Sequence, residues 1–420
     1  MKLRSVTPMK IAKYGYIAIS AIFTLAGLAM IFYPTPSQSF IGIFFGIAIL
    51  VFGIIKLVGY WSRDLFRLAF QYDLQFGVLL CVLGIITLIR HKDAVAFLCV
   101  AYGICIMADS LFKIRTALDA KAFGIRSCLC YEVSDRDGEE KCDLAIRENG
   151  DFIRHCAREK NPMISAMFGG HALFTISDRT FEKMVKENNG MTGFHIHVSE
   201  GMNDVYDTAY NYGTRSVNRL LNNGILGPKT MLGHCIHVNP AEMDIIRETG
   251  TMVCNNPESN MGNAVGCAPV LQMIKKGITV GLGTDSYTFD MLESLKVALI
   301  IQRHNACMPN VAWCEVTDML FKNNAKIGAK YFPDQLGVLK AGAAADIIVM
   351  DYKPFTPFSD ANIDGHMIFG MTGRQCQTTI AAGKVLMKDR VLVNIDEEAE
   401  NAHILEAAKK LWGDLNHRVY

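Results

Sequence analysis

Six short β-rich runs constrain the fold of this chain most, because each is followed by a stretch that reads as a helix. They lie between residues 126 and 285 and read RSCLCYEV, MISAMFGG, GFHIHVSE, TMLGHCIHV, TMVCNNP and ITVGLGTD. Strands alternating with helices predict a parallel α/β sheet. Polar residues gather where the runs end, which is typical of the active face of a TIM-type (β/α) barrel.

The sequence after residue 331 predicts a small β appendage. The segments GVLKAGAAADIIVMDYKP and TTIAAGKVLMKDRVLV combine strand-forming and turn residues, and a helical stretch follows them to the C-terminus. We therefore expect a barrel part over residues 124–335 and an appendage with its terminal helix over residues 336–420.

Residues 1–123 have a different composition. Four strongly apolar segments occur there, at residues 11–33, 40–61, 75–90 and 94–114. Each is near the length needed to cross a bilayer, and four in succession exceed what a cleaved signal peptide supplies. The hydropathy thus predicts a module of four transmembrane helices, with the lipid bilayer as its partner.

The distribution of positive charges orients this predicted module. Basic residues precede the first segment, occur around the turn after the second at Lys56, Arg63 and Arg67, and follow the fourth. Only Arg90 and Lys92 fall on the other side. We expect a multi-pass membrane protein in which both termini, and the part after residue 124, are cytoplasmic.

Charge and cysteine content exclude some other classes. The formal net charge is +1 and dense basic runs are absent, so electrostatics gives no support to a nucleic-acid partner. The 13 cysteines are scattered without a C-x-x-C pair, which favours reduced thiols over a disulfide framework.

The strand ends carry side chains that suit metal chemistry. His195 and His197 lie on one face of a strand by alternation, Glu200 follows them, and His234 and Asp285 end later runs. Neutral imidazoles and a carboxylate can hold a divalent metal that acidifies water into a hydroxide nucleophile. Taken singly, Glu200 is also compatible with a helix-start acid, and each histidine with a core or surface role. Their ordered recurrence at strand ends favours a site.

Five motifs in order resemble the metal-dependent amidohydrolase superfamily, in its aminohydrolase and chlorohydrolase branch. They are FHIHVSE, LGHCIHV, CNNPESNM, GLGTDS and GVLKAGAAADIIVMD, and the resemblance covers about residues 124–420. The segments LCYEVSDRDGEEKCD and GGHALFTISD are most similar to the selenium-metabolism aminohydrolases. Residues 10–124, with SFIGIFFGIAILVFGIIKLVGYW, resemble the HdeD membrane proteins, also called the domain of unknown function 308.

The resemblance implies a hydrolase of carbon–nitrogen bonds other than peptide bonds, acting on a small amine or heterocycle. It implies metal ligation by His197, His234 and Asp285, and catalysis by Glu200 as proton shuttle together with His234 and Asp285. His171 matches a substrate-binding histidine. The implied cofactor is a divalent metal, zinc or iron, and the oligomeric state stays open.

The sequence departs from the family at the first barrel strand, which normally ends in an H-x-H pair of metal ligands. The only H-x-H here is His195–His197, and 88 residues separate His197 from Asp285. Six further βα units of about 35 residues each do not fit in that interval, so the pair belongs to strand five. We expect an incomplete barrel of strands three to eight, weak metal binding and impaired activity. The alternative is a membrane protein of unknown role with a catalytically inactive tail, including one encoded by a chimeric gene.

Overall fold

The computed structural model describes residues 43, 46–54, 57, 73–89 and 123–419. The chain divides into two compact units: Met1–Ile114 with Asp396–Tyr420, and Arg115–Ile395. In the first unit the described elements are a helix over residues 46–54, α3 (Asp73–Ile89) and α16 (Glu397–Val419). The predicted division at residues 123 and 335 stays a prediction.

Glycines let α3 and the helix of residues 46–54 approach closely. A Cβ added to Gly53 would lie 2.7 Å from the backbone nitrogen of Cys81, and one added to Gly84 would lie 2.6 Å from that of Leu50. Gly46 and Gly77 make similar contacts, so the glycines recur every seventh residue on both helices. Only glycine has room at such a crossing.

The prediction of four transmembrane helices is wrong. Within the described residues, no helix is both long enough and apolar enough to cross a membrane. The third predicted segment, residues 75–90, forms most of α3, which has 17 residues and packs one side against another helix. An apolar run of that length also suits a packed helix, which hydropathy alone does not distinguish. Residues 11–33 and 94–114, and half of 40–61, lie outside the described residues. The cellular location stays a prediction.

The second unit contains the predicted parallel strands in the expected order. Five of them form one sheet, β3 (Phe168–Ala172), β4 (Phe194–Val198), β5 (Met231–His234), β6 (Met252–Asn255) and β7 (Val280–Leu282), each paired with the next. β1 (Ser127–Leu129) pairs in parallel with β2 (Ile164–Ala166), which Met167 alone separates from β3. The α/β sheet is therefore confirmed. Closure into a barrel is not seen among the described strands.

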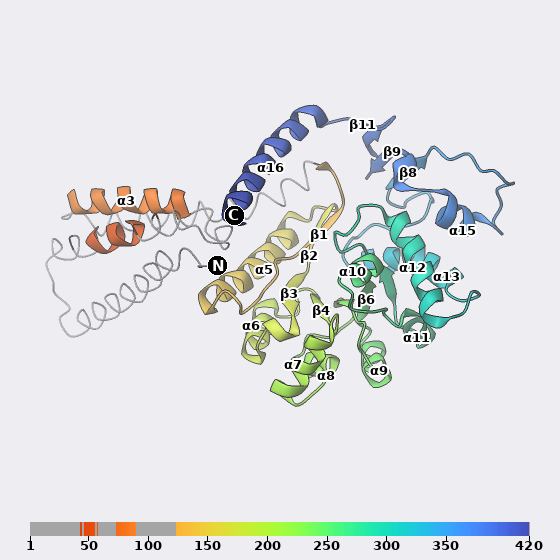
Figure 1. Ribbon diagram of the computed structural model, residues 1–420, viewed down its shortest axis with the longest axis horizontal. Coiled ribbons are helices and arrows are strands. Elements are labelled where there is room, and N and C mark those ends of the chain that lie inside the picture. Colours follow the sequence, from red (N-terminus) through yellow and green to blue (C-terminus); the bar gives the residue numbers. More distant parts are fainter. Residues whose placement is uncertain (1–42, 44–45, 55–56, 58–72, 90–122, 420) are drawn as a thin grey trace. The chain divides into compact units, whose positions relative to one another are not determined.

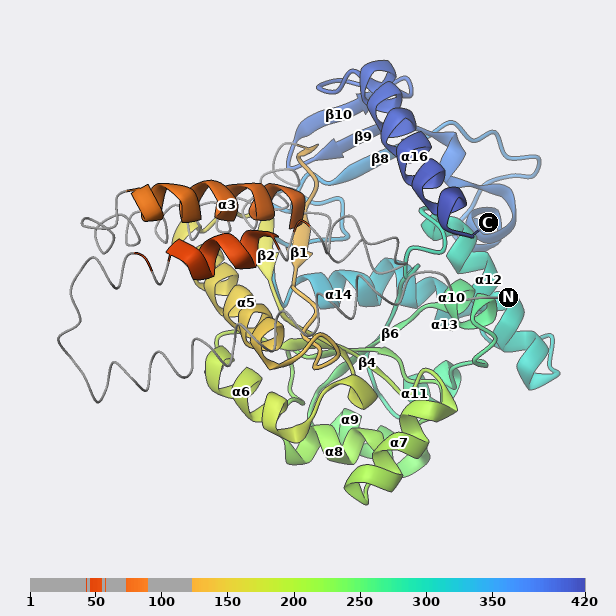
Figure 2. The ribbon, with the colours of Figure 1, turned by 60° about the vertical axis from the view of Figure 1, so that its left-hand side comes forward.

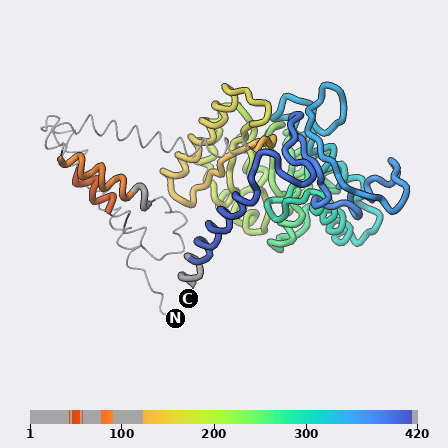
Figure 3. The backbone as a smooth tube through the Cα atoms, turned by 90° about the horizontal axis from the view of Figure 1, so that it is seen from above, coloured from red at the N-terminus to blue at the C-terminus, as the bar shows by residue number. Residues whose placement is uncertain are grey.

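Helices connect successive strands and cover the outside of the sheet. Figure 2 shows α6, α8 and α9 below β4 and β6, and the tube of this unit runs in order from yellow through green to cyan (Figure 3). Buried apolar side chains of strands and helices, such as Phe168, Ile196 and Leu299, form one core. The helices are α5 (Glu139–Glu159), η3 (Leu173–Thr175), α6 (Asp178–Asn188), α7 (Met202–Tyr212), α8 (Ser216–Asn222), α9 (Pro240–Glu248), α10 (Pro257–Gly262), α11 (Val270–Lys275), α12 (Met291–Ala306), α13 (Trp313–Asp318), η4 (Met319–Asn323) and α14 (Asn324–Gly328).

The predicted appendage is an antiparallel sheet in the same unit (Figure 1). Its strands pair in chain order and are β8 (Ile347–Met350), β9 (Cys376–Ala381), β10 (Lys384–Lys388) and β11 (Val391–Leu392). Between β8 and β9 the chain forms α15 (Ile363–Gly365), η5 (His366–Gly370) and η6 (Gly373–Gln375).

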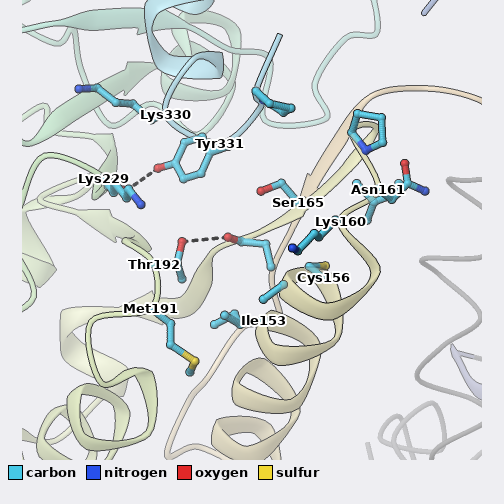
Figure 4. A pocket seen from close by; sticks show the side chains of 15 residues that line it. Ile153, Cys156, Lys160, Asn161, Ser165, Met191, Thr192, Lys229, Lys330 and Tyr331 are labelled. Atoms are coloured by element: carbon cyan, nitrogen blue, oxygen red, sulfur yellow. Dashed lines mark hydrogen bonds between the residues drawn. The ribbon is translucent and has the colours of Figure 1, made fainter.

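A cavity of about 310 Å³ opens where the parallel strands begin. Its lining includes Ile164, the first residue of β2, and Thr192 and Lys229, which precede β4 and β5. Figure 4 shows the Tyr331 hydroxyl donating to the Lys229 carbonyl across this cavity. The strand ends that carry His197 and His234 lie at the opposite edge of the sheet, so this cavity is separate from the predicted site.

Candidate metal centre

Three predicted site residues come together where β4 and β5 end. Potential ligand atoms of His197, Glu200 and His234 all lie within 4.8 Å of one another. The parallel register places Val198 opposite His234 and His197 opposite Gly233. The ring centroids of His197 and His234 are 5.2 Å apart. Adjacent parallel strands thus bring together residues that are far apart in sequence.

The ring of His234 is oriented by an amide from α10. Its Nδ1 lies 2.8 Å from Oδ1 of Asn260, and the residue is only 1% exposed. An amide oxygen only accepts hydrogen bonds, so Nδ1 carries a proton, and in the neutral imidazole the lone pair is on Nε2. This Nε2 lies 3.8 Å from a carboxylate oxygen of Glu200 and 3.8 Å from one of Asp285.

Asp285, the fourth predicted residue, follows β7 and faces the same point. The Ser259 hydroxyl donates to Asp285 Oδ2 over 2.6 Å. A short hydrogen bond from a neutral donor stabilises the ionised carboxylate and limits its rotation. Ser259 of α10 thus holds Asp285 Oδ2, and the same oxygen faces Nε2 of His234.

A chain of hydrogen bonds positions Glu200. The Tyr287 hydroxyl donates to the side-chain oxygen of Asn263 over 3.0 Å, and the Asn263 amide donates to Glu200 Oε1 over 3.1 Å. The other oxygen, Oε2, is the one that faces His234. Glu200 therefore presents a free oxygen to the centre of the cluster while its partner oxygen is held.

The backbone at these strand ends adopts an uncommon conformation. Ser199, His234 and Asp285 have φ values of 48°, 66° and 50°, in the left-handed region that favours glycine. Such residues concentrate at functional sites, where the surrounding structure holds them. Here the sharp bend after each strand directs the side chain of His234, Asp285 or the following Glu200 toward the cluster.

Two further histidines lie beside His197. As predicted, His195 shares its face of β4, and the two ring centroids are 6.4 Å apart. Burial lowers the pKa of His195 to about 4, and the nearby charge of His197 acts in the same direction. His171, on β3, has its ring centroid 5.7 Å from that of His197, and burial lowers its pKa as well. The structure thus places the predicted substrate-binding histidine at the edge of the cluster.

The donor set fits a first-row divalent metal. It consists of two imidazoles and two carboxylates, which such ions bind in proteins. Ligand atoms that share one tetrahedral ion at about 2.1 Å lie roughly 3.4 Å apart. The separations of 3.8 Å from His234 to Glu200 and Asp285 are close to that spacing, and they are too long for direct hydrogen bonds.

All four residues predicted for the centre therefore converge, and their individual roles stay predictions. No sequence pattern assigned Asn260, Ser259, Asn263 or Tyr287 to the centre. These partners come from the segment after β6 and the loop after β7. The motif CNNPESNM was noticed as a resemblance, but nothing in its spacing showed which side chain would reach Asp285.

The comparison with known families decides where this fold and centre belong. The family model described as the amidohydrolase family matches residues 102–386. The chain belongs to the amidohydrolase family. A second model, a short repeat of unknown function (DUF308), matches residues 18–89. Both resemblances inferred from the motifs are confirmed. The amidohydrolase match begins before the predicted residue 124 and ends before residue 420, and the DUF308 match lies within the predicted residues 10–124.

Curated relatives of this amidohydrolase include deaminases. The 5'-deoxyadenosine deaminase of Methanosarcina mazei is 33% identical over 327 residues, which cover 76% of this chain and 73% of that protein. The 5-methylthioadenosine/S-adenosylhomocysteine deaminase of Desulforudis audaxviator is 27% identical and covers 74% and 73% of the two chains.

A solved structure confirms the fold. An adenosine deaminase from Xanthomonas campestris with bound zinc superimposes with a TM-score of 0.66 at 22% identity, covering 72% of this amidohydrolase and 70% of that chain. The atrazine chlorohydrolase of Arthrobacter aurescens complexed with zinc gives a TM-score of 0.57 at 21% identity over 69% and 67%.

Proposed function

We propose that this amidohydrolase is a metal-dependent deaminase that hydrolyses the exocyclic amino group of a small nitrogen heterocycle, of the adenine nucleoside type. The convergence of Glu200 and Asp285 on the free Nε2 of His234 is the observation that supports it best. The substrate class is inferred from the 5'-deoxyadenosine deaminases among the relatives.

The reaction forms a C–O bond from water and breaks the C–N bond of the amino group, which leaves as ammonia. A divalent ion held by His197, His234 and Asp285 would lower the pKa of water and so supply the nucleophile at neutral pH. Of the two water protons, Asp285 accepts one and releases it to the ring nitrogen of the product. The free oxygen of Glu200 takes the other and delivers it to the leaving amino nitrogen. Asn263 keeps Glu200 turned toward the centre for both transfers.

Weak metal binding is part of the proposal. The sequence contains a single H-x-H, and His195–His197 already supplies it from β4. Without a second pair the ion has fewer imidazoles, and both its affinity and its effect on water should fall. A catalytically inactive member of the family is the competing possibility, and the same observation favours it.

The test is ammonia release by the purified full chain with added Zn²⁺, Fe²⁺ or Mn²⁺. The substrates are 5'-deoxyadenosine, adenosine and 5-methylthioadenosine. Turnover that Glu200→Gln abolishes, and that Glu182→Gln on the exposed face of α6 leaves intact, is the expected result. Absence of ammonia at saturating metal supports the inactive alternative. Stoichiometric Zn²⁺ at submicromolar affinity contradicts the weak-binding part alone.

A further inference from the structure

A second group of potential ligands shares His197 with the candidate centre. Glu132, His171 and His197 each offer one ligand atom, and these three atoms lie within 4.8 Å of one another. Neither Glu132 nor His171 takes part in the hydrogen bonds that orient His234, Asp285 and Glu200. The group therefore needs its own explanation.

Strand pairing brings Glu132 beside His171. Val133 forms an isolated parallel bridge with Gly170, and the His171 backbone N–H donates to the Val133 carbonyl over 2.9 Å. Gly169 permits this approach, because a Cβ there would lie 2.3 Å from the Tyr131 carbonyl oxygen. Glu132 directly precedes the bridge on its strand, and His171 directly follows it on β3. Side-chain alternation therefore places both on the same face, next to each other.

An irregularity in β3 turns His171 toward His197. Gly169 pairs with His195 and Ala172 with His197, so β3 has one residue more than β4 in this interval. Such a bulge redirects the side chain of the strand that contains it, and bulges are frequent beside active sites.

Hydrogen bonding leaves the outer nitrogen of His171 free for a cation. The Thr175 hydroxyl donates its single proton to the Ala172 carbonyl over 2.9 Å. Its oxygen lies 2.9 Å from His171 Nδ1 and must accept there, so Nδ1 is protonated and Nε2 keeps the lone pair. Metal-binding histidines commonly have their other nitrogen held in this way.

Glu132 is available for the same purpose. Its side chain is exposed, and within the described residues it makes no hydrogen bond or ion pair. An ionised carboxylate close to two imidazoles, one of which presents a lone pair, attracts a cation. Two histidines and a glutamate form the ligand set of several hydrolytic zinc sites, and two histidines with a carboxylate also bind Fe²⁺.

We propose that Glu132, His171 and His197 form a second binding position for a divalent transition-metal ion, next to the candidate centre. A neutral imidazole offers one lone pair, so His197 serves one ion at a time. The two positions are therefore alternatives, and a chain that has bound its ion through Glu132 lacks an ion beside Glu200 and Asp285. The proposal stands whether or not the chain is a deaminase.

The first experiment measures the reactivity of His171 with diethyl pyrocarbonate in the purified full chain, with and without Zn²⁺. Trypsin releases residues 161–179, in which His171 is the sole histidine, and residues 304–322, in which exposed His304 is the sole histidine. Zn²⁺ should lower the modification of His171 severalfold and leave His304 unchanged. The Glu132→Gln exchange should remove most of this protection, and Glu140→Gln, at the exposed start of α5, should preserve it. Equal protection in the two variants, or none in the unchanged chain, overturns the proposal.

The second experiment isolates the position from the candidate centre. A Glu200→Gln, Asp285→Asn double variant should still bind one Co²⁺ with visible absorption bands, and adding Glu132→Gln should weaken binding at least about tenfold. Adding Glu140→Gln instead provides the control, and far-UV circular dichroism checks folding of each variant. A double variant that is folded but binds no Co²⁺ overturns the proposal, and ammonia release plays no part in either readout.

Discussion

Ser259 contributes a single hydroxyl to the candidate centre, yet that hydroxyl holds Asp285 over 2.6 Å. Replacing Ser259 with alanine removes the donor while leaving every potential ligand in place. Because residues that orient metal ligands influence affinity by about 10- to 100-fold, we expect Ser259→Ala to weaken Zn²⁺ binding by about tenfold. Isothermal titration of the full chain measures this. Ser134→Ala removes a hydroxyl that, among the described residues, is bonded only to Arg136, and it should leave the affinity unchanged. A similar loss in both variants would contradict the assignment.

Asp204 makes stability depend on pH. It lies on α7, is 2% exposed, and accepts a hydrogen bond from the Ser199 backbone N–H over 2.5 Å. Burial raises the pKa of this carboxyl to about 6. The folded state thus holds the proton more tightly than the unfolded chain does. The free energy of unfolding therefore falls as the pH rises from about 4 to about 6, and it stays lower above that range.

The Asp204→Asn exchange should remove this dependence. An amide is neutral at every pH, and its oxygen can still accept from Ser199. We expect a gain on the order of 1–3 kcal/mol near pH 7.5 and little change near pH 4.5. Thermal denaturation at the two pH values measures both. Exposed Glu182, exchanged for glutamine, provides the control. An equal change at both pH values would count against burial of the charge as the cause.

Arg219 connects α8 to η3 and the start of α6 through buried hydrogen bonds and an ion pair. This residue of α8 is 1% exposed, and its guanidinium donates to the carbonyls of Leu173 and Ile176 over 2.7 and 2.6 Å and pairs with Asp178 over 2.8 Å. These bonds fix η3, whose Thr175 orients His171. The position of a candidate binding residue on β3 therefore depends on a buried cation two helices away.

We expect Arg219→Lys to destabilise the chain by roughly 3–5 kcal/mol, because one ammonium cannot reach all three acceptors and leaves buried carbonyls unpaired. Urea denaturation followed by circular dichroism measures the loss. Arg179→Lys on the exposed face of α6 should change stability by less than about 0.5 kcal/mol. Comparable effects of the two exchanges would refute the anchoring role.

The close approach of the α3 glycines to the helix at residues 46–54 leads to a separate prediction for the first unit. A leucine at position 84 would overlap Leu50 of the helix at residues 46–54, because a Cβ added to Gly84 would already lie 2.6 Å from the backbone nitrogen of Leu50. Overpacking of this kind costs about 1–3 kcal/mol or more. Hydrogen exchange followed by mass spectrometry should therefore show faster exchange over residues 46–54 and 73–89. Ile85→Leu, at an outward position that is 47% exposed, should leave exchange unchanged. Unchanged hydrogen-exchange rates in Gly84→Leu would show that close packing of the two helices contributes no stability to this unit.

The elements of the second unit could be predicted from the sequence because strand and helix periods differ. His197, Glu200, His234 and Asp285 could be placed together for a simple reason. Each follows a short apolar run, and parallel strands end on one edge of a sheet. Hydropathy failed for residues 75–90, since burial against lipid and burial against another helix select the same side chains.

The remaining site residues depend on geometry that no pattern encodes. Ser259 and Asn263 reach Asp285 and Glu200 only because α10 folds back over the strand ends. His171 turns toward His197 because β3 contains one extra residue relative to β4. A bulge leaves no clear mark in a short run such as MISAMFGG, so the second ligand group was not predicted.

Considered as a whole, the second unit has sheets in which spatial order repeats chain order. β3 to β7 pair in sequence, β1 pairs with β2, and the appendage strands β8 to β11 also follow one another. Within each sheet a new strand therefore pairs with the strand made just before it, which limits the length of chain that each pairing must close and so its entropic cost. During synthesis the partner of each strand has already left the ribosome, since domains are made from the N-terminal side. The sheet can grow by one strand at a time as the chain emerges, and the four residues of the candidate centre meet only when β7 is added.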